Sequence, residues 1–314
     1  MLSGVRIGVV GAGVFGAYHA EKYACCDRAI LTAVCDLDSA RAAALAEKHA
    51  ALAISNIDDF LNAVDAVVVT APASCHFDIA AKALDAGRHV FVEKPLTLST
   101  EHADALIDRA AKQGLVLQIG HQERYVFDAV GLLNRDRTPL KIDCVRSGPP
   151  SGRCEDVSVV FDLMVHDLDL VRKLTTSDIK RLSAEGDTRE INAEMVLENG
   201  TVVALKASRC ADKPERRMTL VYDDGVIDFD FVNRTLENST MAKLNEAFKT
   251  ENASKALRDP LGFGAELFVI SILDGIAPVV TGPDGRDAVA WAVQIEDAAG
   301  ITSSGVPEIE RLRA

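Results

Sequence analysis

The chain has 314 residues, of which 48% are hydrophobic and 26% are charged. This composition is typical of a globular protein and argues against disorder, and the length is sufficient for about two domains. The formal net charge of −13 argues against nucleic acid as a partner, because a global acidic field repels phosphate backbones. No apolar run approaches the roughly 18 residues of a membrane span, and the short glycine-rich start is typical of a strand and turn rather than a signal peptide.

Helical and strand-like stretches alternate over the first 120 residues. Strands are predicted at 5–10, 30–35, 65–70, 90–93 and 115–119, and helices at 14–24, 39–49, 74–86 and 99–113. Asn56 can cap a further short helix, since its side chain can accept the first free backbone N–H groups. Such alternation predicts an α/β unit, a doubly wound parallel sheet with right-handed crossovers, over residues 1–120.

The remaining residues, 121–314, have a different pattern. Strand-like runs lie at 142–146, 179–185, 191–197, 202–208, 218–222 and 226–231, with helices predicted at 159–174, 260–276 and 284–299. Asn199-Gly200 and Asp224-Gly225 are strong hairpin signals. The polar stretch 233–255 is predicted to be a loop. We expect a second domain of α+β type with a mostly antiparallel open sheet.

Residues 11–16, GAGVFG, form a G-x-G-x-x-G motif between the first predicted strand and helix, which is the context that dinucleotide binding requires. The helix N-terminus would face the pyrophosphate in a Rossmann domain. Asp36 follows the second strand, 20 residues after Gly16 (36 − 16), where a carboxylate can bind the ribose hydroxyls and repel a 2′-phosphate. NAD is therefore the expected cofactor. Its predicted contacts here are Gly11, Gly13, Val14, Phe15, Gly16 and Asp36.

Two sets of polar residues could carry chemistry. Lys94, in Glu93-Lys94-Pro95, follows a parallel strand at the edge where the cofactor would bind, although its position alone also fits a solvated surface lysine. Asp162 and His166 are i,i+4 neighbours on a predicted helix, so the carboxylate could orient the imidazole. An exposed, salt-bridged helix face fits the same pair equally well.

The seven cysteines are odd in number and include no C-x-x-C pair, so we expect no metal site and reduced thiols in a cytoplasmic protein.

Several of these motifs together resemble the Gfo/Idh/MocA oxidoreductases. The resemblance rests on the glycine motif, Asp36, residues 70–76, Glu93-Lys94-Pro95, residues 120–124 and Asp162-x-x-x-His166. It implies that Lys94, Asp162 and His166 are catalytic, that the cofactor is NAD(P), and that the substrate is a sugar or cyclitol. It implies a homodimer or homotetramer formed through the C-terminal sheet. It adds cofactor contacts at Thr70, Ala71, Pro72, His76, Glu93, Lys94 and Gln122.

Residues 114–121, 153–170, 198–200 and 207–209 more narrowly resemble the branch that contains UDP-N-acetylglucosamine 3-dehydrogenases. That resemblance implies oxidation of the C3 hydroxyl of a sugar nucleotide on the way to a diamino sugar of lipid A. A diphosphate favours arginine as its ligand. Arg146 lies near the motifs and is considered for this role together with the arginines among the predicted substrate contacts. The predicted substrate contacts are Lys94, Arg124, Tyr125, Arg153, Asp162, His166 and Arg209.

The expected mechanism gives the proton of the hydroxyl to His166, held by Asp162, while Lys94 bonds the same oxygen; Lys94 could be the base instead. Two alternatives stay open. The substrate could be a free sugar, inositol or other polyol, which needs no arginine cluster. The protein could also be a non-catalytic, NAD-binding regulatory protein, although such a protein has no use for a proton acceptor in this place.

Overall fold

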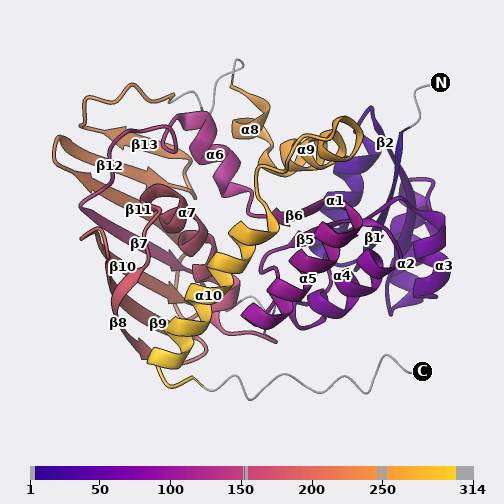
Figure 1. Ribbon diagram of the computed structural model, residues 1–314, viewed down its shortest axis with the longest axis horizontal. Helices are drawn as coiled ribbons and strands as arrows, with labels where there is room; N and C mark the ends of the chain where they lie inside the picture. Colours follow the sequence, from indigo (N-terminus) through magenta and orange to yellow (C-terminus); the bar gives the residue numbers. More distant parts are fainter. Residues whose placement is uncertain (1–3, 151, 153–154, 246–247, 249–252, 302–314) are drawn as a thin grey trace.

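The computed structural model describes residues 4–301 except 151, 153–154, 246–247 and 249–252. It contains two sheets side by side, with helices on both faces of the first and on one face of the second (Figure 1). None of the described helices is long and apolar enough to cross a membrane.

The first sheet is parallel throughout, in the strand order β3-β2-β1-β4-β5-β6. Its strands are β1 (Val5–Val10), β2 (Ala29–Cys35), β3 (Leu52–Ala53), β4 (Ala66–Val69), β5 (His89–Glu93) and β6 (Leu117–Gly120). The order reverses between β1 and β4, which opens a crevice at the carboxyl ends of the strands. The predicted doubly wound parallel sheet is confirmed, and β3 is a short strand that the sequence pattern does not reveal.

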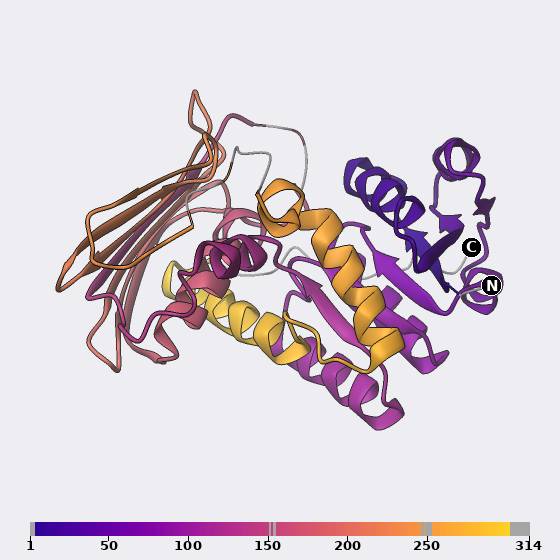
Figure 2. The same ribbon diagram turned by 90° about the horizontal axis from the view of Figure 1, so that it is seen from above.

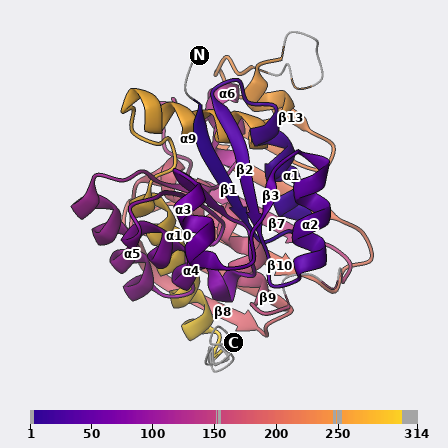
Figure 3. The same cartoon turned by 90° about the vertical axis from the view of Figure 1, so that its right-hand side faces the viewer.

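Five helices join these strands. They are α1 (Val14–Ala24), α2 (Ser39–Lys48), α3 (Ile57–Ala63), α4 (His76–Asp85) and α5 (Thr100–Gln113). The Asn56 side chain caps α3 as predicted, and Ser99 caps α5, which ends at Gly114 with a left-handed φ of 64°. Helix α4 begins at His76 because residues Ala73–Cys75 form a 3₁₀ turn. Figure 3 shows α1 and α2 on one side of β1 and β2, and α4 and α5 on the other.

The second sheet has the order β13-β12-β11-β7-β10-β9-β8, antiparallel except for the β7–β10 pair. Its strands are β7 (Lys141–Ser147), β8 (Ile179–Gly186), β9 (Glu190–Leu197), β10 (Val202–Ser208), β11 (Glu215–Tyr222), β12 (Gly225–Asp230) and β13 (Thr235–Asn238). Both predicted hairpins, β9–β10 and β11–β12, are confirmed. The predicted loop 233–255 is wrong in part, because β13 pairs with β12 and helix α8 (Lys255–Arg258) begins at its end.

The helices of the C-terminal part lie between the sheets. They are α6 (Glu123–Val130), the π-helical turn η2 (Val160–Met164), α7 (Val165–Thr175), α9 (Pro260–Asp274) and α10 (Gly282–Ala298). Figure 2 shows α6, α7 and α10 on one face of the second sheet, whose other face is uncovered, whereas α9 lies along the first sheet. Three residues of α9 pack with β1 residues in the core of the first sheet: Ala265, Phe268 and Val269. A segment from the C-terminal part of the chain therefore contributes to the core of the first sheet. The division into domains at residue 120 stays a prediction.

Candidate active site

The glycine turn between β1 and α1 is closely packed at two of its three glycines. Gly11 has a φ of +99°, and a Cβ added there would lie 2.7 Å from the Ala71 backbone nitrogen. A Cβ on Gly16 would lie 1.8 Å from the Gly11 carbonyl oxygen. A Cβ on Gly13 would meet no atom within 4 Å. The fold itself therefore requires Gly11 and Gly16, whereas the absence of a side chain at Gly13 leaves free space over the N-terminus of α1.

Asp36 lies beside this turn, at the end of β2. Its carboxylate accepts hydrogen bonds from the Ala12 backbone nitrogen at 2.5 Å and the Asp38 backbone nitrogen at 2.8 Å. Val14 and Phe15 are 49% and 44% exposed at the start of α1. Free space, a helix N-terminus and a neighbouring carboxylate fit a dinucleotide whose pyrophosphate lies over Gly13.

Substituting two glycines separates binding from folding. Gly13→Ala should change stability by less than about 1 kcal/mol, because the new methyl group meets nothing in the protein. It should weaken NAD binding at least about tenfold, since the methyl group takes up space over the helix N-terminus. Gly16→Ala should instead lose about 3 kcal/mol or more, because the contact at 1.8 Å is with backbone. Denaturant unfolding and NAD titration measure both effects. Wild-type NAD affinity in Gly13→Ala would refute this placement.

The loop after β4 is held to the turn and to the end of β5. The Thr70 hydroxyl donates to the carbonyl oxygens of Val10 at 3.0 Å and Gly11 at 2.8 Å. His76 is buried, with Nδ1 2.7 Å from the Pro95 carbonyl oxygen and Nε2 3.0 Å from that of Ala71. Both ring nitrogens of His76 therefore face backbone. The predicted cofactor contact of this side chain is corrected to a role in holding two site loops together, whereas contacts by Thr70, Ala71 and Pro72 stay predictions.

Glu93 is buried at the end of β5. His19 donates to its Oε1 atom over 2.7 Å, and Gln122 donates to the same atom over 2.6 Å. Burial alone would raise the pKa of Glu93, but the hydrogen bond and charge of His19, the charge of Lys94 and the Gln122 amide hold it below its usual value. Glu93 is thus a buried anchor behind Lys94, and the cofactor contacts predicted for Glu93 and Gln122 stay predictions.

Lys94 and Asp162 meet, as the sequence predicted for residues of one site. Lys94 Nζ donates to the Asp162 backbone carbonyl at 2.6 Å and to Oδ1 at 3.2 Å. Arg209 Nη2 donates to the other carboxylate oxygen of Asp162 at 2.9 Å. The pKa of Asp162, which burial would raise, is held low by the charges of Lys94 and Arg209. The side chains of Lys94, Asp162 and Arg209 remain 12%, 15% and 12% exposed, so solvent still reaches this cluster.

The predicted Asp162–His166 pair is wrong. The hydrogen bonds and ion pairs of the described residues join Asp162 to Lys94 and Arg209 and not to His166. The physical reason is the π-helical turn at Val160–Met164, whose i,i+5 hydrogen bonds displace residues from the i,i+4 stripe of an α-helix. His166 instead lies with Nδ1 3.8 Å from Oε2 of Glu123.

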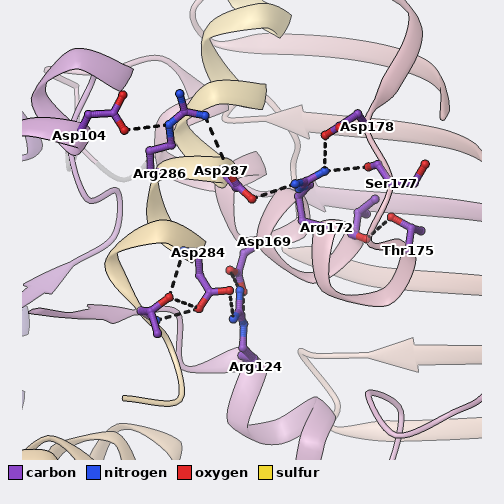
Figure 4. Close-up of polar contacts among 12 residues, drawn as sticks. Asp104, Arg124, Asp169, Arg172, Thr175, Ser177, Asp178, Asp284, Arg286 and Asp287 are labelled. Carbon is purple, nitrogen blue, oxygen red and sulfur yellow. Dashed lines mark hydrogen bonds and ion pairs between the residues drawn. The ribbon is translucent and has the colours of Figure 1, made fainter. Parts of the chain in front are cut away.

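Two predicted substrate contacts, Arg124 and Tyr125, are buried and already bonded. Arg124 is 2% exposed and ion-paired with both Asp169 and Asp284, joining α6, α7 and α10 (Figure 4). Tyr125 is 2% exposed, and its hydroxyl accepts a hydrogen bond from Gln118. Neither side chain has a face left for a substrate, so both predictions are corrected to structural roles.

The other two arginines considered for a diphosphate differ. Arg146 is 2% exposed and is bonded to Glu123 and Asp167, which removes it from direct substrate contact. Arg153 lies outside the described residues. Arg209 adjoins Asp162, so of the described arginines considered it alone borders the site. Within the described part of the chain no group of three or more His, Cys, Asp or Glu side chains is arranged to hold a metal ion.

Sequence reasoning missed three residues at this site, His19, His121 and Glu123. The ring of His121 lies 6.4 Å from that of His166, and neither of its nitrogens has a hydrogen-bond partner among the described residues. The position of His19 could have been predicted from the sequence. It lies three residues after Gly16 and therefore on the same face of α1 as the glycine motif. Glu123 and His121 border the predicted contact Gln122 in the chain, but their contacts with His166 are tertiary.

Comparisons with known proteins agree with this geometry. Residues 5–121 match the GFO_IDH_MocA family model, described as an oxidoreductase family with an NAD-binding Rossmann fold. The chain is 36% identical to UDP-N-acetylglucosamine 3-dehydrogenase of Acidithiobacillus ferrooxidans, over 94% of this chain and 97% of that one. A solved structure of that enzyme superposes with a TM-score of 0.85, covering 96% of this chain and 99% of that one at 35% identity. Myo-inositol 2-dehydrogenase of Thermotoga maritima is 26% identical over 91% of this chain and 93% of that one.

Proposed function

The chain belongs to the Gfo/Idh/MocA family of NAD-binding oxidoreductases, and from this membership we propose that it oxidises a sugar hydroxyl to a ketone. The C3 hydroxyl of UDP-N-acetylglucosamine is the favoured substrate group. The observation that carries the chemistry is the convergence of Lys94 and Asp162, which are 68 residues apart in the chain, at a place where the charge of Lys94 also acts on His166. A site that only stored a nucleotide would not need an amine and an imidazole together.

Gly11, Gly13, Gly16 and Asp36 would hold the cofactor. When bound, NAD supplies the acceptor for the hydride of the substrate carbon. The protein contributes the free space over Gly13, the amides at the start of α1 and the carboxylate of Asp36. Hydrogen bonds from Thr70 to Val10 and Gly11 hold this turn in place, which lowers the cost of ordering it on binding.

Lys94 is the hydrogen-bond donor to the reacting substrate oxygen. Its Nζ donates to two oxygens of Asp162, an arrangement typical of an ammonium group, and a third N–H remains for the substrate. Asp162 and Arg209 fix the direction of that third N–H. As the hydroxyl loses its proton, the ammonium stabilises the negative charge that develops on the oxygen.

His166 is the base. Burial, together with the charges of Lys94 and Arg146, lowers the pKa of His166 well below its usual value. The imidazole is therefore neutral near pH 7 and has one nitrogen with a free lone pair. A neutral imidazole can accept the hydroxyl proton at once, whereas an ammonium group first has to lose its own. We therefore propose His166, rather than Lys94, as the base.

The pH dependence of kcat/KM follows from the direction of this pKa shift. The neutral form of His166 is active, so kcat/KM should stay level as pH falls from 8 to about 6.5 and decrease only below the ordinary histidine pKa. Steady-state rates in a constant-ionic-strength buffer series measure the profile. An acid limb centred at or above pH 6.5 would contradict a neutral, buried His166 as the base.

The favoured substrate is supported by similarity over the whole chain to a UDP-N-acetylglucosamine 3-dehydrogenase. Arg209 borders Lys94 and Asp162, and guanidinium groups suit a diphosphate. We place the product, a 3-keto sugar nucleotide, on the way to an amino sugar such as that of lipid A. An enzyme that makes such a product must be followed by an amine-transferring step.

A free polyol is the second candidate, favoured by one observation. The internal ion pairs of Arg124 and Arg146 leave fewer arginines for a diphosphate than the sequence suggested. A neutral cyclitol needs none, and the chain is also similar to a myo-inositol 2-dehydrogenase.

The deciding experiment incubates the purified protein with NAD and a panel of UDP-sugars, free sugars and inositols, with a carbonyl trap, and follows the absorbance of reduced cofactor. We expect UDP-N-acetylglucosamine to give a kcat/KM at least 10²-fold above that of any inositol, a difference of about 2.7 kcal/mol. Turnover of polyols alone would replace the favoured substrate. NAD binding without turnover of any compound would favour the regulatory alternative.

We further propose that the protein is a cytoplasmic homodimer or homotetramer, joined through the second sheet. On its outer face Val196 pairs with Val202 and Val221 pairs with Val226, all four are at least partly exposed, and Lys141 of β7 lies between the two pairs. Exposed apolar pairs on an uncovered sheet face favour an interface there. All six described cysteines have free thiols, which suits a reducing compartment. Sedimentation equilibrium measures the subunit number.

A further inference from the structure

His166 has an unexplained buried atom. Its Nδ1 is buried and has no hydrogen-bond partner among the described residues. A buried polar atom without a partner destabilises the fold, so such an atom at an active site calls for an explanation. Asp162 does not supply the partner, because its carboxylate is bonded to Lys94 and Arg209 and makes no hydrogen bond to His166 within the described residues.

Among the described residues, Glu123 is the acidic side chain that forms an ion-pair contact with this atom. Its Oε2 lies 3.8 Å from His166 Nδ1, and the two side chains are 19% and 17% exposed. The separation exceeds a hydrogen bond by about 1 Å. Hydrogen bonds of catalytic residues are often long in a site without substrate and shorten in the complex.

Arg146 fixes the position of Glu123 relative to His166. Its Nη1 and Nη2 donate to the two carboxylate oxygens of Glu123, each over 2.8 Å. The same guanidinium donates to both oxygens of Asp167, at 3.1 Å and 2.7 Å. Asp167 directly follows His166 on α7. One buried arginine thus ties the Glu123 carboxylate to the backbone that carries the imidazole.

We propose that Glu123 is the positioning residue for His166. Its carboxylate accepts a hydrogen bond from Nδ1–H, which leaves the lone pair of Nε2 to receive the proton of the substrate hydroxyl. In that step the substrate O–H bond breaks and an Nε2–H bond forms, and NAD, when bound, would supply the acceptor for the hydride of the same substrate carbon. The carboxylate also stabilises the imidazolium that results. This inference rests on the proposed function.

The other charged groups around His166 favour the same arrangement. Lys94, His121, Arg146 and Arg216 approach it from four different parts of the fold, and each disfavours a charged imidazole. The neutral ring carries one N–H group, and none of those four neighbours offers a carboxylate to accept it. Glu123 does, so the Nδ1–H tautomer is the one that the surroundings stabilise.

The test reads the tautomer of His166 without substrate. Long-range ¹H–¹⁵N spectra of histidine-labelled protein, with His166 assigned through a His166→Asn variant, should show Nδ1 protonated in the wild type. Glu123→Gln should lose this preference, whereas Asp162→Asn should keep it. A wild type with Nε2 protonated, or a loss of preference in Asp162→Asn alone, would overturn the inference. Because no turnover is needed, this result is independent of the proposed reaction.

Kinetics supply the second measurement. Glu123→Gln should lower kcat about 10²-fold and leave the KM for NAD within about twofold, because the base is disordered while the cofactor turn is untouched. The acid limb of its kcat profile should move to lower pH, since the imidazolium loses its carboxylate. Glu123→Asp should recover part of kcat. An unchanged kcat together with an unchanged profile would count against Glu123.

Discussion

Replacing Lys94 by alanine should reduce kcat at least 10³-fold while NAD still binds, a loss of about 4 kcal/mol of transition-state stabilisation. The reason is that the ammonium stabilises the charge on the substrate oxygen only as the proton leaves, so the loss appears in kcat and not in ground-state binding. Lys94 lies outside the glycine turn, and Asp162 retains its bond to Arg209 in the variant. Steady-state rates and NAD titration measure the two effects separately.

Lys82→Ala is the matched control. Lys82 is also paired with an aspartate, Asp58, over 2.8 Å, but both side chains are largely exposed, at 45% and 67%. Its removal should leave kcat within about twofold, because exposed pairs contribute little. If Lys94→Ala turned over at more than a tenth of the wild-type rate, Lys94 would have no part in the chemistry.

The second large effect concerns stability. Arg124→Met should lower the free energy of unfolding by about 3–5 kcal/mol, because it leaves two carboxylates, Asp169 and Asp284, without their cation. Asp169 is 1% exposed, and burial already works against the charge on Asp284, whose pKa the charge of Arg124 holds below its usual value. Figure 4 shows Arg124 between these two side chains, where α6, α7 and α10 meet. Denaturant unfolding followed by circular dichroism measures the loss.

Arg137→Met provides the comparison. Arg137 donates to Asp223 over 2.6 Å, yet the two side chains are 50% and 66% exposed. Solvent screens this pair, so the expected change is below about 1 kcal/mol. Equal losses in the two variants would mean that burial of the Arg124 cluster adds nothing to the fold.

Much of the fold could be predicted from the sequence because every strand of the first sheet except β3 is a short, mainly apolar run followed by a change of pattern. Strand β4 is buried at all four positions, so its apolar run is continuous. Strand β13 was not predicted because three of its four residues are polar, and only its pairing with β12 identifies it as a strand. Strand β3 has two exposed residues and no pattern to detect.

The sequence predicted which residues belong to the site, but it did not predict which of them contact one another. Lys94, Asp162 and His166 follow from motifs, yet the π-helical turn that contains Asp162 and ends two residues before His166 was not predicted from the sequence. Arg124 and Arg146 resembled surface arginines because charge alone does not reveal burial. One signal existed for Arg146, since Ile142, Cys144 and Arg146 alternate along β7 and so share its inner face. Nothing in the sequence distinguishes Arg124, whose partners lie 45 and 160 residues away (169 − 124 and 284 − 124).

The most direct test of the proposed reaction follows one deuterium atom. The protein is incubated with NAD and UDP-N-acetylglucosamine deuterated at C3, with a carbonyl trap, and both products are examined by mass spectrometry. The trapped ketone should have lost its deuterium and the reduced cofactor should have gained it. A trapped ketone that keeps the deuterium, or reduced cofactor without the label, would contradict hydride transfer from C3.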